Sequence, residues 1–316
     1  MSKVAYLFPG QGSQAVGMGA DLCAHSPAAL RVFDEADEVL EIKLSTLCFY
    51  GPEDALRQTL NTQPALFVTS VAALRALEEA GAPRPQAVAG HSVGEYAALV
   101  AAGAIDFATG LRLVQRRAQE MLRAGEAAPG AMAAVLGLAG EDVEAACADA
   151  RQSGAGVVQA ANFNGGGQVV ISGTPEGVAA ATEAAKARGA KRVVPLNVSG
   201  AFHSALMRPA AEALAHFLPN VTINNAALPI VANLTADYET TADEIRTNLA
   251  AQIDHPVRWE QSVVRLAQDG FDTFVEVGAG AVLTGLVKRL APDAATYSVG
   301  DSAGVQAWVA AATGRV

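Results

Sequence analysis

Short apolar runs alternate with longer segments of helical character along most of the chain. Val4–Phe8 is a continuous apolar run that stops at Pro9 and Gly10, and Ala87–Gly90 is a second run of small apolar residues. Runs of this length between turn residues are typical of buried strands. A helix is expected between them at Thr62–Ala80. Strands that alternate with helices predict an α/β fold with a parallel sheet.

A different pattern occupies the middle of the chain. The expected strands are Ala131–Leu138, Val157–Phe163, Gln168–Ser172 and Lys191–Asn197, and the expected helices are Glu141–Gln152 and Pro175–Arg188. Their order, β-α-β-β-α-β, is the ferredoxin-like arrangement. We therefore expect a ferredoxin-like domain at residues 127–197. It would be inserted into a larger α/β domain formed by residues 1–126 and 198–316.

A serine lies at the end of the second apolar run. Residues 90–94 read Gly-His-Ser-Val-Gly, which matches the G-x-S-x-G pattern of a nucleophile elbow. The glycines are needed because the serine sits on a tight turn between a strand and a helix. A helix is expected at Glu95–Ala102, and its free N–H groups can stabilise an oxyanion. A capping serine at a glycine-rich helix entry is the structural alternative. The strand–helix context favours Ser92 as a covalent nucleophile in an α/β-hydrolase-like domain.

A serine nucleophile needs a base within hydrogen-bond reach. Of the five histidines, His203 is the best placed, because its loop follows the last strand of the small domain and would lie at the domain junction. His91 adjoins the serine and is expected to position the loop. No acid stands out at a strand end between Ser92 and His203. We therefore expect a backbone carbonyl or an amide to hold the histidine tautomer.

Seven segments together resemble the malonyl-CoA:acyl carrier protein transacylases, the acyltransferases of fatty acid synthesis. They are Phe8–Gln14, Gly90–Glu95, Gln115–Arg117, Asn162–Asn164, Gly200–Met207, Glu276–Gly278 and Leu283–Leu286. The resemblance implies that a malonyl group passes from coenzyme A to the phosphopantetheine thiol of acyl carrier protein. It implies a ping-pong mechanism through an acyl-serine, with malonyl-CoA as substrate and no cofactor.

The resemblance also assigns roles to matching positions. Ser92 would be acylated, His203 would be its base, and Gln252 would orient the histidine. The backbone N–H groups of Gln11 and Val93 would form the oxyanion hole.

Arg117 matches the residue that binds the free carboxylate of the malonyl group, and its helix allows a separate argument. Asp106 is expected to cap that helix, which would reach about Ala124. Its apolar stripe consists of Phe107, Leu111, Val114, Ala118 and Met121. Arg116 points away from the stripe and is expected to be solvated, whereas Arg117 lies on its edge and needs an anionic partner. That partner is either a carboxylate such as Glu95 or the substrate.

Two residues near these motifs are further candidates for substrate binding. Phe202 either packs over the acyl pocket or belongs to the core. Asn162 either forms hydrogen bonds near the site or simply starts the turn beside it.

Charge and composition limit the partners. The net charge of -10 argues against nucleic-acid binding and would repel anionic partners at long range. Coenzyme A and acyl carrier protein are both anionic, so a local basic patch at Lys186–Arg192 is a hypothesis for their docking. The 3 cysteines and 5 histidines show no metal spacing, and the cysteines fit reduced thiols. We find no apolar run of membrane-spanning length and no signal-peptide layout, and we expect a cytoplasmic monomer.

Three other functions remain open at this point. Residues 10–15 fit the dinucleotide pattern G-x-G-x-x-A, but the required second strand would fall near Phe33–Asp37, which reads as helical. A hydrolase would share the acyl-serine, because the elbow alone does not separate hydrolysis from transfer. A non-catalytic carrier-binding module would need no serine–histidine pair.

Overall fold

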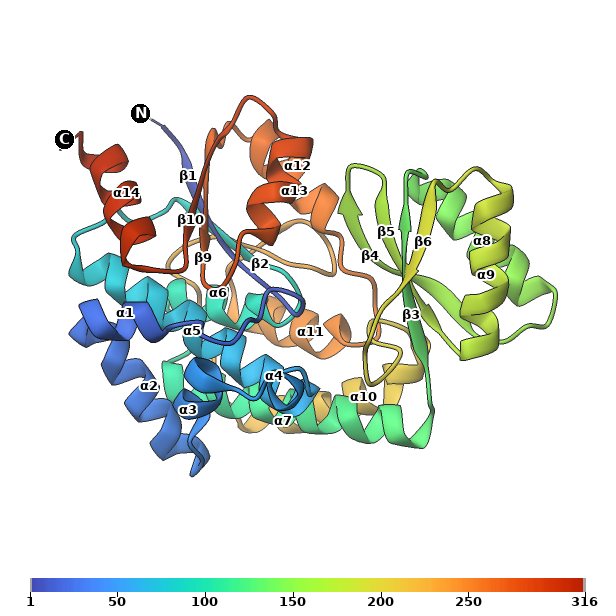
Figure 1. Ribbon diagram of the computed structural model, residues 1–316, viewed down its shortest axis with the longest axis horizontal. Coiled ribbons are helices and arrows are strands. Elements are labelled where there is room, and N and C mark those ends of the chain that lie inside the picture. Colours follow the sequence, from blue (N-terminus) through green and yellow to red (C-terminus); the bar gives the residue numbers. More distant parts are fainter. Residues whose placement is uncertain (1, 315–316) are drawn as a thin grey trace.

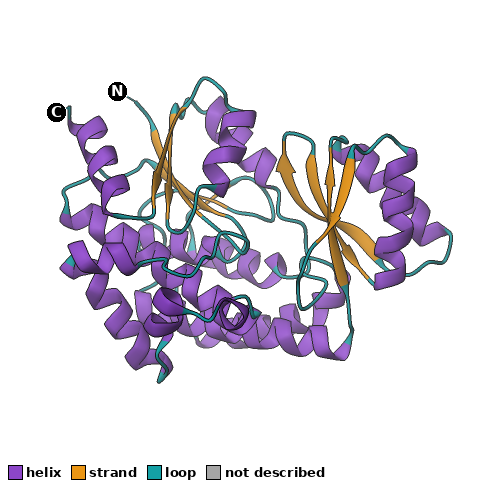
Figure 2. Ribbon diagram, in the orientation of Figure 1, coloured by secondary structure: helices purple, strands orange, loops and turns teal. Residues whose placement is uncertain are grey.

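The chain forms two separate β-sheets, each covered by helices (Figures 1 and 2). The computed structural model describes residues 2–314, so the outer bounds expected for the larger domain, residues 1 and 316, lie outside the described residues. In spatial order, the large sheet contains β10 (Ala295–Val299), β9 (Thr273–Val277), β1 (Val4–Phe8), β2 (Ala87–Gly90), β7 (Ile230–Val231) and β8 (Tyr238–Glu239). All neighbouring strands are parallel except β7 and β8.

Helices bury both faces of the large sheet. Alternate side chains of β1 point to opposite faces. Tyr6 and Phe8 belong to the core formed with α2 (Pro27–Leu40), α5 (Thr59–Glu79) and α6 (Gly94–Ala101). On the opposite face, Ala5 and Leu7 pack against α12 (Trp259–Gln268) and α13 (Val282–Leu290). This two-sided burial explains why β1 is a continuous apolar run.

The remaining helices surround this centre. They are α1 (Ala20–His25), α3 (Leu44–Tyr50), α4 (Glu53–Leu56), α7 (Phe107–Ala127), α10 (Arg208–Phe217), α11 (Ala242–Gln252) and α14 (Ser302–Thr313), with 3₁₀ turns at Ala205–Met207 and Leu218–Asn220. Asp106 caps α7 as expected, since its side chain accepts a hydrogen bond from the Thr109 N–H. No helix among residues 2–314 is both long enough and apolar enough to cross a membrane.

The small sheet has the expected ferredoxin-like topology. Its spatial order is β4 (Val158–Gly165), β5 (Gln168–Gly173), β3 (Ala131–Leu136) and β6 (Arg192–Pro195), and all pairs are antiparallel. Helices α8 (Gly140–Gln152) and α9 (Pro175–Ala187) cover its outer face, at the right of Figure 1. The opposite face turns toward the large sheet and contributes Met132 and Val170 to a pocket.

The helices α8 and α9 and the small sheet enclose a hydrophobic core of their own. Every residue of that core lies between Ala131 and Val193. We propose on this basis that residues 127–197 are an inserted domain and that residues 2–126 and 198–314 belong to the larger one.

Several expected boundaries needed correction. The helix expected at Thr62 begins at Thr59, because Pro64 and a polar first turn hide its start. The strand expected to reach Leu138 ends at Leu136, where Gly137 adopts a positive φ of 75°. The dinucleotide interpretation is wrong, since Phe33–Asp37 lies in α2 rather than in a strand.

Candidate active site

Ser92 occupies a strained turn between β2 and α6. Its φ of 52° lies in the left-handed region, which is unusual for a non-glycine residue. A Cβ on Gly90 would lie 2.0 Å from the carbonyl carbon of Gly94, and a Cβ on Gly94 would lie 2.1 Å from the carbonyl oxygen of Phe8. Both glycines are therefore required by close backbone approach, and the turn raises Ser92 above the end of the sheet.

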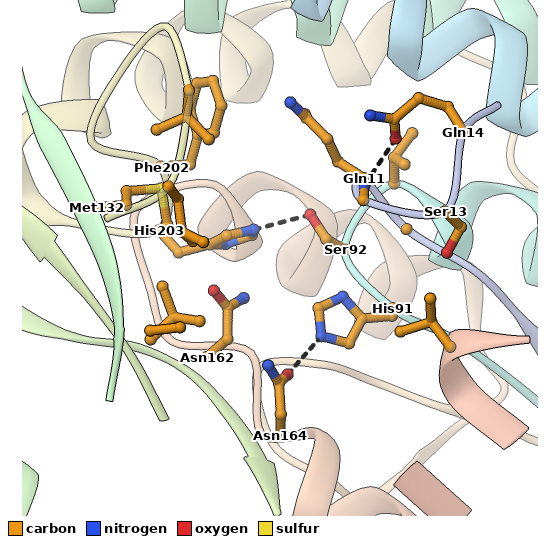
Figure 3. Close-up of a pocket in the computed structure, with 18 of the residues that line it drawn as sticks. Gln11, Ser13, Gln14, His91, Ser92, Met132, Asn162, Asn164, Phe202 and His203 are labelled. Carbon is orange, nitrogen blue, oxygen red and sulfur yellow. Dashed lines mark hydrogen bonds between the residues drawn. The ribbon is translucent and has the colours of Figure 1, made fainter. Parts of the chain in front are cut away.

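His203 faces the serine from the opposite side of the pocket (Figure 3). The distance between Ser92 Oγ and His203 Nε2 is 2.8 Å. On the other side of the ring, Nδ1 lies 3.0 Å from the carbonyl oxygen of Gln252 and 3.2 Å from that of His255. Two carbonyl acceptors fix the proton on Nδ1, so Nε2 is the nitrogen that can accept the serine proton.

Burial keeps the His203 ring neutral. Loss of solvation and the nearby Arg117 guanidinium lower the pKa of His203 to about 3. Its free nitrogen is therefore available as a base throughout the physiological pH range.

His91 is turned away from the reacting atoms. Its Nε2 lies 2.9 Å from Asn164 Oδ1, and its ring packs against Trp259 with 5.4 Å between ring centroids. Burial lowers the pKa of His91. The ring thus connects the elbow to β4 of the small sheet.

The backbone N–H groups of Gln11 and Val93 are free donors. Neither has a hydrogen-bond acceptor within the described part of the chain. Both residues line the same pocket as Ser92, and Gln11 lies across from His203 in Figure 3. Two unpaired N–H groups beside a nucleophile can receive the negative charge that forms on an attacked carbonyl oxygen.

Arg117 is buried more deeply than its helix pattern indicated, with 1% of its surface exposed. Its Nη2 donates to Ser92 Oγ and to Gln252 Oε1, both at 3.0 Å, and its Nη1 donates to Gln63 Oε1. No carboxylate of residues 2–314 forms an ion pair with it. Burial lowers the pKa of Arg117. A buried cation beside the nucleophile, held by neutral groups, needs an anion to compensate its charge.

Arg116 differs from its neighbour. Its Nε lies 2.9 Å from Glu120 Oε1, and its side chain is partly exposed. It is therefore an ion-paired surface residue rather than the simply solvated charge that the helix pattern predicted.

The pocket has a volume of about 450 Å³ and lies between the two sheets. Asn162 and Phe202 both line it, and both are almost fully buried. Phe202 also belongs to the main hydrophobic core, so the two interpretations of this residue are compatible.

Sequence reasoning missed Asn233, which supports the elbow. Its side-chain Oδ1 accepts a hydrogen bond from the Ser92 N–H at 2.7 Å, and its Nδ2 donates to the Gly90 carbonyl at 2.6 Å. Asn233 follows the short strand β7. Its only sequence signal was a polar residue just after a strand end, and the short strand itself was not predicted. Gln63, which contacts Arg117, was missed because it lies inside a long apolar helix.

The expected basic cluster is partly neutralised. Lys186 pairs with Glu183, and Arg188 pairs with Asp149. Lys191 and Arg192 are exposed and form no ion pair among the residues described.

Comparisons with known proteins identify one family. Residues 5–306 match the family model described as acyl transferase domain. The malonyl CoA-acyl carrier protein transacylase of Bacillus subtilis (strain 168) is 48% identical over 301 residues, which cover 95% of this chain and 94% of that protein.

Two solved structures are also similar. The malonyl CoA-acyl carrier protein transacylase of Coxiella burnetii superposes with a TM-score of 0.95 at 38% identity, covering 99% of this chain and 98% of that one. A malonyl-transacylase solved in complex with its type II PKS acyl-carrier protein superposes with a TM-score of 0.93 at 43% identity. That alignment covers 98% of this chain and 99% of the other.

Proposed function

The chain belongs to the acyl transferase family of malonyl CoA-acyl carrier protein transacylases, and from this premise we propose how its residues carry out malonyl transfer. The enzyme moves malonyl from coenzyme A to the phosphopantetheine thiol of acyl carrier protein. The observation that carries the assignment of roles is the position of Arg117. Its guanidinium lies 3.0 Å from Ser92 Oγ and lacks a carboxylate partner among residues 2–314.

In the first half-reaction, Ser92 becomes acylated. His203 Nε2 takes the hydroxyl proton while the serine oxygen attacks the malonyl thioester carbonyl. The oxyanion accepts hydrogen bonds from the N–H groups of Gln11 and Val93. The carbon–sulfur bond then breaks, and coenzyme A leaves with the proton from His203.

In the second half-reaction, the phosphopantetheine thiol of the carrier replaces coenzyme A. His203 removes the thiol proton, and the thiolate attacks the malonyl ester on Ser92. The same two N–H groups stabilise the second oxyanion. When the ester bond breaks, Ser92 takes back the proton from His203, so the enzyme returns to its starting state. Both half-reactions use only groups of the chain and its substrates.

The selectivity for malonyl would come from Arg117. The free carboxylate of a malonyl ester on Ser92 would extend toward the guanidinium, whose Nε has no partner among the described residues. A guanidinium binds a carboxylate through two parallel hydrogen bonds. We assign Phe202 to the wall of the acyl pocket and Asn162 to hydrogen bonding of the bound thioester.

Initial-rate kinetics test the two-step scheme. Malonyl-CoA is varied at several fixed concentrations of holo acyl carrier protein. The scheme predicts parallel double-reciprocal lines, because the first product leaves before the second substrate binds. Lines that intersect would require both substrates on the enzyme together and would contradict the two-step scheme.

The carrier belongs to fatty acid synthesis in this proposal. A polyketide carrier is a second candidate, because one similar solved enzyme is bound to a type II PKS carrier protein. Free thiols at Cys23, Cys48 and Cys147 fit a cytoplasmic enzyme, and the site is built from a single chain, which fits a monomer.

A further inference from the structure

Glu95 is a buried carboxylate for which the transfer mechanism has no use. It lies in the first turn of α6, three residues after the nucleophile, and 0% of its surface is exposed. Its Oε2 accepts two hydrogen bonds, from the Asn233 N–H at 2.9 Å and from Gln252 Nε2 at 3.1 Å. A buried carboxylate is costly unless its surroundings use it.

Both donors also form hydrogen bonds with Ser92 or His203. Asn233 Oδ1 accepts the Ser92 N–H, and its Nδ2 donates to the Gly90 carbonyl. The backbone carbonyl oxygen of Gln252 accepts the hydrogen bond from His203 Nδ1. The amide of Gln252 also accepts a hydrogen bond from Arg117 and donates one to the Ser92 carbonyl at 3.0 Å.

The three segments joined at this oxygen come from distant parts of the chain. Ser92 and Glu95 belong to the elbow, Asn233 lies just beyond β7, and Gln252 ends α11. Separations of 138 and 157 residues divide Glu95 from its two donors. One acceptor therefore fixes the nucleophile, the base and the binding arginine relative to one another.

We propose that Glu95 is the positioning residue of the transfer site, acting through Asn233 and Gln252 on Ser92, His203 and Arg117. The inference rests on the proposed function and deepens it. Glu95 touches no substrate and takes no proton from it. Its contribution is the acceptor Oε2, while Oε1 has no partner among residues 2–314.

The side-chain amide of Gln252, which lies between Glu95 and Arg117, explains the selectivity for a substrate carboxylate. A direct ion pair would neutralise the guanidinium and compete with a substrate carboxylate. Here the side chain of Gln252 lies between Glu95 and Arg117, so Arg117 is held in place while its charge stays available. Burial raises the pKa of Glu95, and hydrogen bonds from Asn233 and Gln252 and the charge of Arg117 oppose that rise. A proton on Oε1 would leave Oε2 free to accept both bonds.

The test compares Glu95→Ala with Glu95→Gln. Acylation of Ser92 is measured with malonyl-CoA and with acetyl-CoA, per mole of folded protein. The alanine variant should lose at least tenfold in kcat/KM for malonyl-CoA, and its ratio of malonyl to acetyl should fall at least threefold. The glutamine variant keeps an oxygen acceptor and should stay within about threefold of the parent enzyme in both quantities.

Glu239 provides the matched control. It is another buried glutamate, but within residues 2–314 its carboxylate accepts a single hydrogen bond, from Asn248 Nδ2. Glu239→Gln should leave the malonyl-to-acetyl ratio unchanged. A similar drop in that ratio in Glu239→Gln would show a general effect of buried charge and overturn the proposal.

Three other results would overturn it. They are an unchanged selectivity ratio in folded Glu95→Ala, a Glu95→Gln variant as impaired as Glu95→Ala, and full rate and selectivity in Glu95→Asp. In Glu95→Asp the side chain is shorter by one methylene group. This variant replaces Glu95→Ala in the test if the alanine variant does not fold. A parent enzyme that forms no malonyl ester would contradict the proposed function instead, so the two failures are distinct.

Discussion

At the scale of single residues, the proposed base His203 has no carboxylate as a direct hydrogen-bond partner among residues 2–314. The His203 Nδ1 proton is shared between the carbonyls of Gln252 and His255. Carbonyl dipoles fix the tautomer, but they stabilise an imidazolium less than an ionised acid would. Burial and the charge of Arg117 hold the ring neutral, whereas the two carbonyl hydrogen bonds act in the opposite direction and raise its pKa.

A pH profile tests this neutral base. The pKa of His203 is lowered to about 3, so the reactive neutral form persists as the pH falls well below 6.5. The rate of Ser92 acylation by malonyl-CoA, measured by rapid quench from pH 8 to pH 5, should change by less than about threefold. A loss of tenfold or more centred near pH 6.5 would show an ordinary histidine and contradict the account.

Arg117 can be tested against its immediate neighbour. Arg117→Ala should lower the preference for malonyl over acetyl by about tenfold to a hundredfold, because an unpaired charge-assisted hydrogen bond costs about 1.5–3 kcal/mol. The preference is measured as the ratio of kcat/KM values. Arg116→Ala removes a partly exposed, ion-paired charge and should leave the ratio intact. Unchanged selectivity in Arg117→Ala would refute the assignment.

At the scale of elements, the elbow depends on the close approach of β1 and α6. Gly94→Ala would place a Cβ 2.1 Å from the Phe8 carbonyl oxygen, so the strand or the helix must move. We expect a loss of about 1–3 kcal/mol in the free energy of unfolding, together with slow acylation. Denaturant unfolding and the acylation rate measure the two effects.

Gly285 in α13 is the matched control, because no atom of another element in residues 2–314 lies within 4 Å of an added Cβ there. Gly285→Ala should stabilise the protein by up to about 1 kcal/mol, since alanine favours helix. If both variants behaved alike, close packing would not explain the elbow.

The sequence predicted elements best where the local pattern was unambiguous. The bounds of β1 at Val4–Phe8 and of β2 at Ala87–Gly90 were correct, because both are short apolar runs followed by turn residues or a helix start. The β-α-β-β-α-β order also gave the ferredoxin-like topology. The short strands β7 and β8 carry two residues each and leave too little periodicity to detect.

Site residues could likewise be predicted only where the local sequence carried a clear signal. Ser92 could be proposed from its elbow and His203 from its place at the domain junction, whereas Gln11, Val93 and Gln252 came only from the family resemblance. Asn233 was not predicted, because its contact with Ser92 spans 141 residues and depends on the tertiary fold. Glu95 was considered only as a partner for Arg117, and the structure places Gln252 between them.

At the scale of the whole molecule, an acidic enzyme must receive an anionic carrier. With a net charge of -10, docking needs positive charge near the pocket entrance, within a Debye length of about 8 Å. Lys191 and Arg192, at the start of β6, are exposed cations without an ion pair in the described structure. They are the part of the basic cluster that remains available.

Charge reversal tests this docking surface. Lys191→Glu combined with Arg192→Glu should raise the KM for acyl carrier protein at least about fivefold at low salt, with a smaller effect at high salt. Acylation of Ser92 by malonyl-CoA should change little. Lys186→Glu is the control, because Lys186 already pairs with Glu183. If Lys186→Glu raised the KM for acyl carrier protein as much as the double variant, the carrier would dock elsewhere than at Lys191 and Arg192.

In the proposed function, Ser92 holds malonyl as an ester protected from water until a thiol arrives. Intact-mass measurement after mixing the enzyme with malonyl-CoA alone tests it most directly. We expect one long-lived malonyl adduct, absent in Ser92→Ala and discharged by a phosphopantetheine thiol. Rapid release of free malonate without an adduct would show a hydrolase and contradict it.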